Sequence, residues 1–433
     1  MLEFSDIRLS MPKVNIGILT GKERELLRNL AKRVAELANN PQQDMKRELW
    51  RKHNSLQRVR PMVLAFPEDG WRELIPLESM TIQDTFWKSY EWYLKYLLYR
   101  IEHIKDDNII DPVIEVPMLY SFSGWGLDIN LVDSGEYMGS CRIESVLKNT
   151  EDDVKLKPQT IIIDEHSTLE YARVIEEVMG DILTVRVNRS VDRFDKCINK
   201  NLLVEIMLMR GIEQVYLDMY DRPEWLHKIL GFMQGSVMRM MDYIEDNYRM
   251  DLNNGNNHVG TGGLGFTDEL PSKTYNPMGV KFNDLWGQTD SQEMGVASAS
   301  MFDEFGIQYQ IPLMKRYGLS CYGCCESLND KFDVVKKIPN LRRVSISPWT
   351  DIQIAADALS DKYIYSWKPH PVYLSTDAYD VDVIEKYIKN TLEVTRGCVT
   401  EIVFKDTQTF QHHPERLDKA VDIAMKLASE GYR

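Results

Sequence analysis

From about residue 112 onward, the chain repeats one unit: a short apolar run, a cluster of Gly, Pro, Asn or Asp, and then an amphipathic helical pattern. The apolar runs are VIEVPML, ILTVRV, the LNN segment before His258, KFNDLW, GLSCYG, RRVSIS, YIYSWK and EIVFKD. Strand, loop, helix and strand again is typical of parallel βαβ units. Roughly eight such units in about 320 residues predict an α/β fold, a (β/α)8 TIM-type barrel with insertions. An open doubly wound sheet is the alternative, but the chain lacks the G-x-G-x-x-G turn of dinucleotide-binding folds.

The first 110 residues have a helical pattern instead. Thr20 and Glu23 stand at capping-box spacing before a segment whose apolar positions fall on one helix face. A second helix is expected through DTFWKSYEWYLKYLLYRIEHI, after the Pro-punctuated stretch RPMVLAFPEDGW. Because no Ser/Gly linker follows, we expect residues 1–110 to form a helical cap packed on a barrel built from residues 111–433.

Charge and cysteine content exclude several classes of protein. The chain has 52 Lys and Arg against 66 Asp and Glu, a net charge of −14, so its surface repels phosphate backbones and general nucleic-acid binding is not expected. Six cysteines in 433 residues do not make a disulfide framework. The N-terminus MLEFSDIRLSMPK is too charged for a signal peptide, and no run approaches about 20 apolar residues, so no membrane association and a cytoplasmic location are expected.

Reactive groups of a (β/α)8 barrel lie at the carboxyl ends of its strands. One predicted strand ends in Tyr322-Gly323-Cys324-Cys325-Glu326, where Tyr322, Cys324 and Glu326 share one face. If that face points inward, a thiolate and a carboxylate meet at the barrel mouth, and both are competent zinc ligands. The alternative is that these cysteines pack as small apolar side chains.

Other polar groups follow the remaining runs. His258 lies in an Asn- and Gly-rich segment, residues 253–263, and is either a metal ligand or acid/base group or a solvent-exposed loop residue. Asp284, Trp286, Gln288, Lys368 and Asp406 follow or flank later strand-like runs. Polar residues follow strands in any protein, but their recurrence at successive strand ends indicates a pocket.

Several motifs together resemble the uroporphyrinogen decarboxylase superfamily over residues 110–430. They are Asp284 with Gly287 and Gln288, the helix start Ser300-Met301-Phe302-x-Glu304-Phe305, Tyr322-Gly323-Cys324-Cys325, Arg210-Gly211-x-Glu213, and Pro223-Glu224-x-x-His227. The resemblance implies a distorted (β/α)8 barrel. The Arg-rich R-Q-A-G-R segment of the true decarboxylases is missing, and an acidic chain suits a polyanionic porphyrinogen poorly.

The other branch of this superfamily contains corrinoid-dependent methyltransferases, which bind zinc through His-x-Cys and a later Cys. Here Tyr322-Gly323-Cys324 stands in place of His-x-Cys, and Lys405-Asp406 stands where the later Cys is expected. Only Cys324 carries over, so the resemblance implies zinc on Cys324 with replacements from Glu326, His258, Asp406 or Cys325. The YGCCE stretch, the long N-terminal region and the insertion at residues 261–271 look most like anaerobic O-demethylase methyltransferases.

The resemblance implies that the chain demethylates a small methoxylated aromatic compound and transfers the methyl group to Co(I) of a partner corrinoid protein. We expect zinc on Cys324, Glu326 and His258, with Tyr322, Asp284 and Asp406 as catalytic residues. The expected substrate-binding residues are Trp286, Gln288, Trp349, Trp367 and Lys368, with Lys368 or Arg342 pairing with a ring carboxylate. Alternatives are another small methyl donor, transfer to coenzyme M, a decarboxylase-like lyase, and a non-catalytic tetrapyrrole binder.

Overall fold

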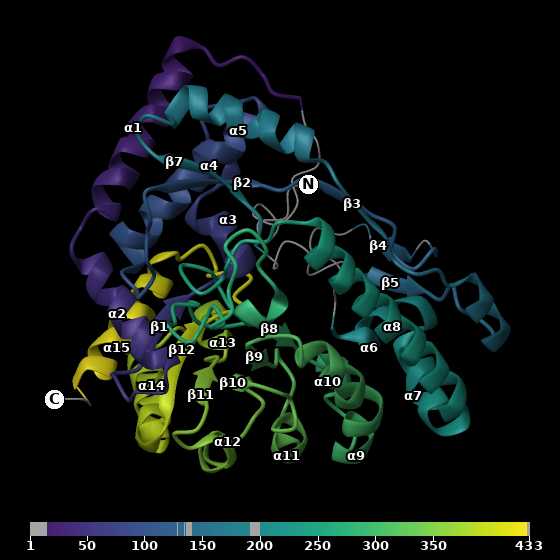
Figure 1. Cartoon of the computed structure of the whole chain (residues 1–433). Coiled ribbons are helices and arrows are strands. Elements are labelled where there is room, and N and C mark those ends of the chain that lie inside the picture. The colour runs from purple at the N-terminus through teal and green to yellow at the C-terminus, as the bar shows by residue number, and fades with distance from the viewer. Residues whose placement is uncertain (1–14, 128, 134, 136–140, 191–199, 431–433) are drawn as a thin grey trace.

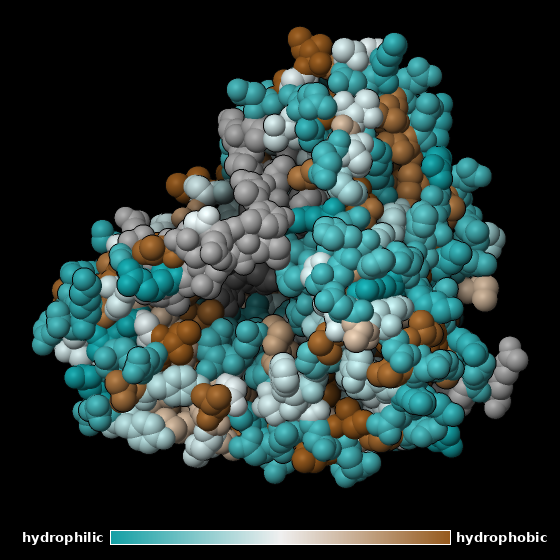
Figure 2. Space-filling view, turned by 180° about the vertical axis from the view of Figure 1, so that it is seen from behind, coloured by the Kyte–Doolittle hydropathy of each residue, from teal (hydrophilic) through white to brown (hydrophobic). Residues whose placement is uncertain are grey.

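The computed structural model describes residues 15–127, 129–133, 135, 141–190 and 200–430 of the chain. Residues 1–13, for which the sequence predicts no signal peptide, and Cys197 lie outside these ranges. None of the helices formed by the described residues combines the length and the apolar character needed to cross a bilayer. One face of the molecule is mostly hydrophilic, with apolar residues scattered over it (Figure 2).

The N-terminal region begins with helices, as predicted. These are α1 (Gly21–Ala38), α2 (Gln42–Asn54), α3 (Trp71–Leu74) and α4 (Thr85–Tyr99), the last continued by a π-helical turn, Arg100–Ile104. The capping box is confirmed, because Thr20 Oγ1 accepts from the Glu23 amide and the Thr20 amide donates to Glu23 Oε2 at 2.8 Å. Between α2 and α3, however, β1 (Met62–Ala65) joins the main sheet beside the last strand of the chain. The sheet therefore draws on both sides of the expected boundary at residue 110.

The main sheet has six parallel strands in the order β1-β12-β11-β10-β9-β8 (Figure 1). Its members besides β1 are β8 (Trp286–Thr289), β9 (Leu319–Tyr322), β10 (Leu341–Ile346), β11 (Ile364–Trp367) and β12 (Val399–Phe404). The runs GLSCYG, RRVSIS, YIYSWK and EIVFKD are thus confirmed as strands, whereas KFNDLW is mostly a 3-10 turn, Phe282–Asp284, that precedes β8. The RPMVLAF run contains β1, which the sequence patterns did not predict.

The hydrogen-bonded sheet does not close into a barrel within the described residues. β2 (Val113–Pro117) and β7 (Thr184–Asn188) form a separate parallel pair, and Ser190 is bridged to Asp251. Side chains link these parts to the main sheet: Asp107 Oδ2 accepts from the Val63 amide at 2.9 Å, and Asn253 Oδ1 accepts from the Trp286 amide at 2.9 Å. The structure is therefore a mixed α/β fold with a six-stranded parallel sheet.

Helices cover the outside of this sheet (Figure 1). They are α9 (Ala299–Met301), a π-helical turn (Phe302–Ile307), α10 (Gln308–Met314), α11 (Phe332–Val335), α12 (Ile352–Leu359), α13 (Val372–Ser375), α14 (Val381–Val394) and α15 (Glu415–Glu430). The middle of the chain adds α5 (Glu165–Met179), α6 (Leu202–Arg210), α7 (Ile212–Asp221) and α8 (Pro223–Asn247). It also forms two antiparallel pairs, β3 (Tyr120–Phe122) with β6 (Ile161–Ile163) and β4 (Asn130–Asp133) with β5 (Cys141–Glu144).

The two faces of the sheet differ in chemistry. Outward residues such as Val344, Ile346, Trp367 and Phe404 belong to the large apolar core shared with the helices. The inner face carries polar residues on adjacent strands, among them Arg343, Ser366 and Glu401, together with the apolar side chains Met62, Leu64 and Val403. The glycine-rich loop after His258 packs on this inner face, so the alternation of residues along each strand separates a helix-covered side from a polar interior.

Candidate functional site at the carboxyl ends of the strands

Ionisable and thiol groups gather where the parallel strands end. Asp290 directly follows β8, and Gly323 to Glu326 follow β9. The next strands along the sheet are followed by polar residues as well. Ser347 follows β10, Lys368 follows β11, Lys405 and Asp406 follow β12, and Glu68 lies shortly after β1. The parallel order of the strands places all of these residues at one edge of the sheet. This edge is where α/β proteins of this kind bind ligands.

A pair of neighbouring thiols lies at this edge. Cys324 Sγ is 3.6 Å from Cys325 Sγ, and Cys325 Sγ is 3.6 Å from Asp406 Oδ2. Lys405 forms ion pairs with Glu68 and, at 3.5 Å, with Asp406. Burial works against the Lys405 ammonium, but Asp406 and Glu68 together raise its pKa, so the lysine remains charged. The structure thus brings Asp406, predicted as catalytic, to the cysteines; its role in a reaction stays a prediction.

The Tyr322 and Glu326 side chains are hydrogen-bonded to one another and do not point into the candidate site at the strand ends. Tyr322 is 1% exposed, and its hydroxyl donates to Glu326 Oε1 at 2.7 Å, while Glu326 Oε2 accepts from the Cys324 amide at 3.0 Å. The Tyr322 ring lies on the outer side of the sheet, edge-on to Phe302 at 6.2 Å. Burial, then the Glu326 carboxylate, raises the pKa of Tyr322 well above its usual value. The condition that Tyr322, Cys324 and Glu326 share an inward-pointing face is not met at Tyr322, because Cys321 occupies the inner face of β9.

The predicted zinc ligands do not come together. Glu326 Oε1 accepts from the Tyr322 hydroxyl and Glu326 Oε2 accepts from the Cys324 amide, so both oxygens already have hydrogen-bond partners. The His258 ring packs edge-on against Phe66, with the ring centroids 4.0 Å apart. Among the described residues, no group of three or more His, Cys, Asp or Glu side chains is arranged to hold a metal ion. The ligand set Cys324, Glu326 and His258 therefore does not fit the ion, and we derive no step through it.

Asp290 is the functional candidate that the sequence patterns missed. Its Oδ1 accepts from Asn201 Nδ2 at 2.7 Å, and Asn201 also donates to Glu293 Oε2 at 2.8 Å. Burial, followed by the charges of Glu326 and Glu293, raises the pKa of Asp290 to about 7. A carboxylic acid that keeps its proton near neutral pH can act as a general acid. The signal was present in the sequence, because Asp290 follows the run WGQT, but the strand was expected to end three residues earlier, at Trp286.

Lys368 places a buried ammonium group on the inner side of the same edge. It is 3% exposed, and its Nζ donates to the Ser366 hydroxyl at 2.6 Å and to the Ser366 carbonyl at 3.1 Å. Burial lowers the pKa of Lys368 to about 8, against the attraction of Glu401. Its hydrogen bonds therefore go to neutral oxygens and leave donor capacity for an anionic group.

On the inner face of the sheet, away from the carboxyl ends of the strands, lies a buried ion pair. Arg343 Nε lies 2.9 Å from Glu401 Oε1, and His53 Nε2 lies 3.1 Å from Glu401 Oε2; all three side chains are buried. Burial opposes the Glu401 charge, but Arg343 and His53 hold its pKa far below the usual range. Burial lowers the pKa of His53, so the imidazole is neutral and donates a hydrogen bond to the carboxylate. We assign this network to stability.

The remaining predicted residues are spread over the sheet. Asp284 lies at the amino end of β8, where its carboxylate accepts from Ser272 and from the Lys281 amide at 3.0 Å. A catalytic role for Asp284 is therefore corrected to a structural one, since it is at the opposite end of the strand from Asp290. Arg342 is likewise occupied by Glu269, with both nitrogens within 2.8 Å of a carboxylate oxygen.

The three tryptophans predicted to bind the substrate differ in solvent exposure. Trp286 is 1% exposed, donates to the Gly265 carbonyl at 3.0 Å and lies under the Arg343 guanidinium. Trp367 is 1% exposed on the outer side, against Tyr387 of α14. Both rings are therefore packed within the protein and do not sandwich a substrate. Trp349 is 63% exposed just past β10.

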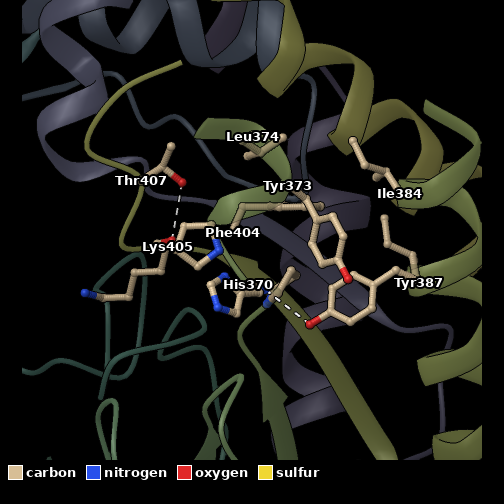
Figure 3. Close-up of a pocket in the computed structure, with 11 residues that line it drawn as sticks. His370, Tyr373, Leu374, Ile384, Tyr387, Phe404, Lys405 and Thr407 are labelled. Carbon is tan, nitrogen blue, oxygen red and sulfur yellow. Dashed lines mark hydrogen bonds between the residues drawn. The ribbon is translucent and has the colours of Figure 1, made fainter. Parts of the chain in front are cut away.

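Gln288 lies two residues after Trp286 on the same inner face of β8 and is partly exposed. A small cavity behind the strand ends is lined by His370, Tyr373 and Tyr387, with Lys405 at its border (Figure 3). The His370 amide donates to the Tyr387 hydroxyl at 3.2 Å across it. At about 10 Å³ this cavity has room for a single water and not for an aromatic ring.

Comparison with known proteins adds little to this description. No family model matches the chain, and no curated protein matches it. Among solved structures, the chain is similar to a methyltransferase from Methanosarcina mazei, at 11% identity and a TM-score of 0.49, covering 90% of this chain and 99% of that chain. A likeness of this degree does not assign an activity, so the assignment has to come from the site and from the sequence motifs.

Proposed function

We propose that the chain is a methyltransferase that demethylates a small methoxylated aromatic compound and passes the methyl group to Co(I) of a partner corrinoid protein. The reaction takes place at the carboxyl ends of the strands of a distorted (β/α)8 barrel. The observation that carries this proposal is Asp290, a carboxylic acid with a pKa of about 7 at the end of β8. The reaction class rests on the resemblance of the YGCCE stretch, the long N-terminal region and the insertion at residues 261–271 to the O-demethylase methyltransferases.

Cleavage of an aryl methyl ether requires help at the oxygen. The phenolate that departs is a poor leaving group unless a proton or another positive charge reaches its oxygen in the transition state. With a pKa of about 7, Asp290 is protonated in about half of the molecules at pH 7, and Asn201 donates a hydrogen bond to its Oδ1 at 2.7 Å. The partner's Co(I) supplies the nucleophile when the two proteins are docked, and Asp290 protonates the oxygen as the methyl group leaves.

Two further side chains fit the substrate. The buried ammonium of Lys368 has donor capacity for a ring carboxylate. The exposed ring of Trp349, beside His370, offers an aromatic surface at the rim. Zinc enters no step of this proposal, because the side chains expected to bind it are otherwise engaged.

The test is an anaerobic assay with the purified chain, a corrinoid protein reduced to the cob(I)alamin state, and either 3-methoxybenzoate or guaiacol. The spectrum of methylated cobalamin should appear together with the free phenol, and Asp290→Asn should lower the rate by at least about 100-fold. Asp361→Asn, an exposed carboxylate before β11, is the matched control and should leave the rate unchanged. If Asp290→Asn and Asp361→Asn both transfer methyl groups at the wild-type rate, Asp290 is not the acid.

A further inference from the structure

Cys324 and Cys325 differ in exposure from Cys321 and Cys398, the other cysteines whose side chains the structure describes. Both are partly exposed, whereas Cys321 and Cys398 are each 2% exposed. The two Sγ atoms are 3.6 Å apart, so a modest rotation of the side chains brings them within bonding distance. Thiols this close to one another and partly exposed are suited to reaction as a pair.

The turn that contains Cys324 and Cys325 is fixed by hydrogen bonds to three other segments of the chain. Gly323 has a φ of 108°, a left-handed conformation that favours glycine, and its amide donates to the Thr289 carbonyl at 3.0 Å. Its carbonyl accepts from the Thr261 hydroxyl at 3.2 Å, and the Cys324 carbonyl accepts from the Ser345 hydroxyl at 3.2 Å. The backbone therefore keeps both thiols at the strand end, and closing a bond between them requires rotation of both side chains and an adjustment of the peptide between Cys324 and Cys325.

Hydrogen bonds connect Cys324, Cys325 and Asp406 in that order, which makes the two thiols chemically different. Cys325 Sγ donates to Asp406 Oδ2 at 3.6 Å, and Cys324 lies on the other side of Cys325. The hydrogen bond with Cys325, followed by burial, raises the pKa of the Cys324 thiol. Cys325 is therefore the thiol next to a proton acceptor, and Cys324 keeps its proton longer.

We propose that Cys324 and Cys325 form a site of reversible thiol–disulfide exchange with small disulfides, in which Cys325 attacks first and Asp406 accepts its proton. The Cys325 thiolate forms a bond to one sulfur of the small disulfide, and the other sulfur leaves with the electron pair and takes up a proton. The Cys324 sulfur then attacks the Cys325 sulfur, the second small thiolate leaves with the electron pair, and the Cys324 proton passes to it, so that it departs as a thiol. The protein is oxidised by two electrons, and one disulfide becomes two thiols.

The product is expected to be easily reduced again. Adjacent Cα atoms are about 3.8 Å apart, which is closer than the usual separation of about 4.4 to 6.8 Å across a disulfide. A disulfide between neighbouring residues is therefore strained, and strained disulfides are the labile ones. This site does not depend on methyl transfer, and its test needs no methyl donor.

The experiment uses the reduced full-length chain and oxidised glutathione as the probe. After exposure, the chain is denatured, alkylated and digested with trypsin, which releases residues 317–331 with three cysteines in one peptide. In the wild-type chain this peptide should take one alkyl group, on Cys321, be two mass units lighter elsewhere, and carry no glutathione. Dithiothreitol should restore three alkylation sites.

Variants separate the roles of the two thiols. Cys324→Ser should stop at a stable glutathione adduct on Cys325, and Cys325→Ser should lose the rapid reaction. Asp406→Asn should slow the exchange about tenfold without changing the product, and Cys398→Ser, a buried cysteine elsewhere, should react like wild type. Circular dichroism and thermal melting establish that each variant is folded.

Two results would overturn the proposal. One is a wild-type peptide that takes three alkyl groups or retains glutathione on both cysteines. The other is an Asp406→Asn variant, folded by the same criteria, that reacts as fast as wild type. In the second case the carboxylate does not accept the proton.

Discussion

The Glu401 carboxylate on β12 and the Arg343 guanidinium on β10 face one another inside the sheet, with Arg343 Nε 2.9 Å from Glu401 Oε1. The two strands are not neighbours, since β11 lies between them and contributes Ser366, whose hydroxyl also donates to Glu401. Two buried charges thus tie three strands together at the centre of the sheet. A buried pair of this kind is strongly destabilising when only one partner is removed.

We therefore expect Glu401→Gln to lower the free energy of unfolding by about 3 to 5 kcal/mol, because Arg343 loses its counter-charge while remaining buried. Glu102→Gln is the matched control, since Glu102 pairs with Arg33 at the surface and should cost less than about 1 kcal/mol. Urea unfolding followed by tryptophan fluorescence measures both. Equal midpoints for the two variants would contradict the structural role of Glu401.

The glycine-rich loop gives a second stability prediction. A Cβ at Gly263 would lie 2.5 Å from Glu401 Oε2 and 2.6 Å from Trp50 Cζ3, whereas a Cβ at Gly397 would meet nothing within 4 Å. Gly263→Ala should therefore destabilise the chain by about 1 to 3 kcal/mol, and Gly397→Ala should have little effect. Thermal unfolding of the two variants measures the difference. A Gly263→Ala chain that melts like wild type would mean that the loop is not packed against Glu401.

The raised pKa of Asp290 predicts the pH dependence of the reaction. The acid form is lost as the pH rises through about 7, so the rate of methyl transfer should fall above that pH. An initial-rate profile between pH 5.5 and about 9 measures this descending limb. A rate that is flat across this range, or that rises through pH 7, would count against an acid role.

The same pKa shift affects stability. The unfolded carboxyl ionises above its ordinary value of 3.8, but the folded one keeps its proton until about pH 7, so the cost to folding grows between these values and is constant above. Asp290→Asn removes that cost. The variant should gain stability relative to wild type at pH 8, by about 1 to 3 kcal/mol, and show no gain at pH 4. A gain of the same size at both pH values would point to a cause other than ionisation.

Lys368 predicts a preference among substrates. Lys368→Met should raise KM for 3-methoxybenzoate by about 10- to 100-fold and change KM for guaiacol, which has no carboxylate, by less than about threefold. In wild type, the preference for the carboxylated donor should weaken above pH 8, as the ammonium with a pKa of about 8 loses its proton. Lys362→Met, an exposed lysine before β11, is the control. Equal losses for both donors in Lys368→Met would exclude carboxylate recognition.

Much of the sheet could be predicted because the later strands are apolar runs followed by clear turns. β9, β10, β11 and β12 were predicted within a few residues of their observed bounds. β8 was misplaced because KFNDLW has strand-like residues, while the true strand, WGQT, is partly polar. Short buried strands have no periodicity that fixes their ends. That error pointed to Asp284 and concealed Asp290.

The side-chain directions were harder to predict than the strands. Along β10, the alternation of Val344 and Ile346 with Arg343 and Ser345 is plain in the sequence, but it does not say which set faces the interior. Here the polar set does, since the helices cover the apolar set. The alternation along β9 likewise did not say whether Tyr322 or Cys321 faces the interior, and the structure places Cys321 there.

The most direct test of the proposed function is the anaerobic transfer assay with a panel of phenyl methyl ethers and a corrinoid protein in the cob(I)alamin state. We predict methylated cobalamin and free phenol in equal amounts, formed only when this chain is present. Equal yields with and without the chain, or no transfer from any ether on the panel, would contradict the proposal that this chain is an aryl methyl ether methyltransferase.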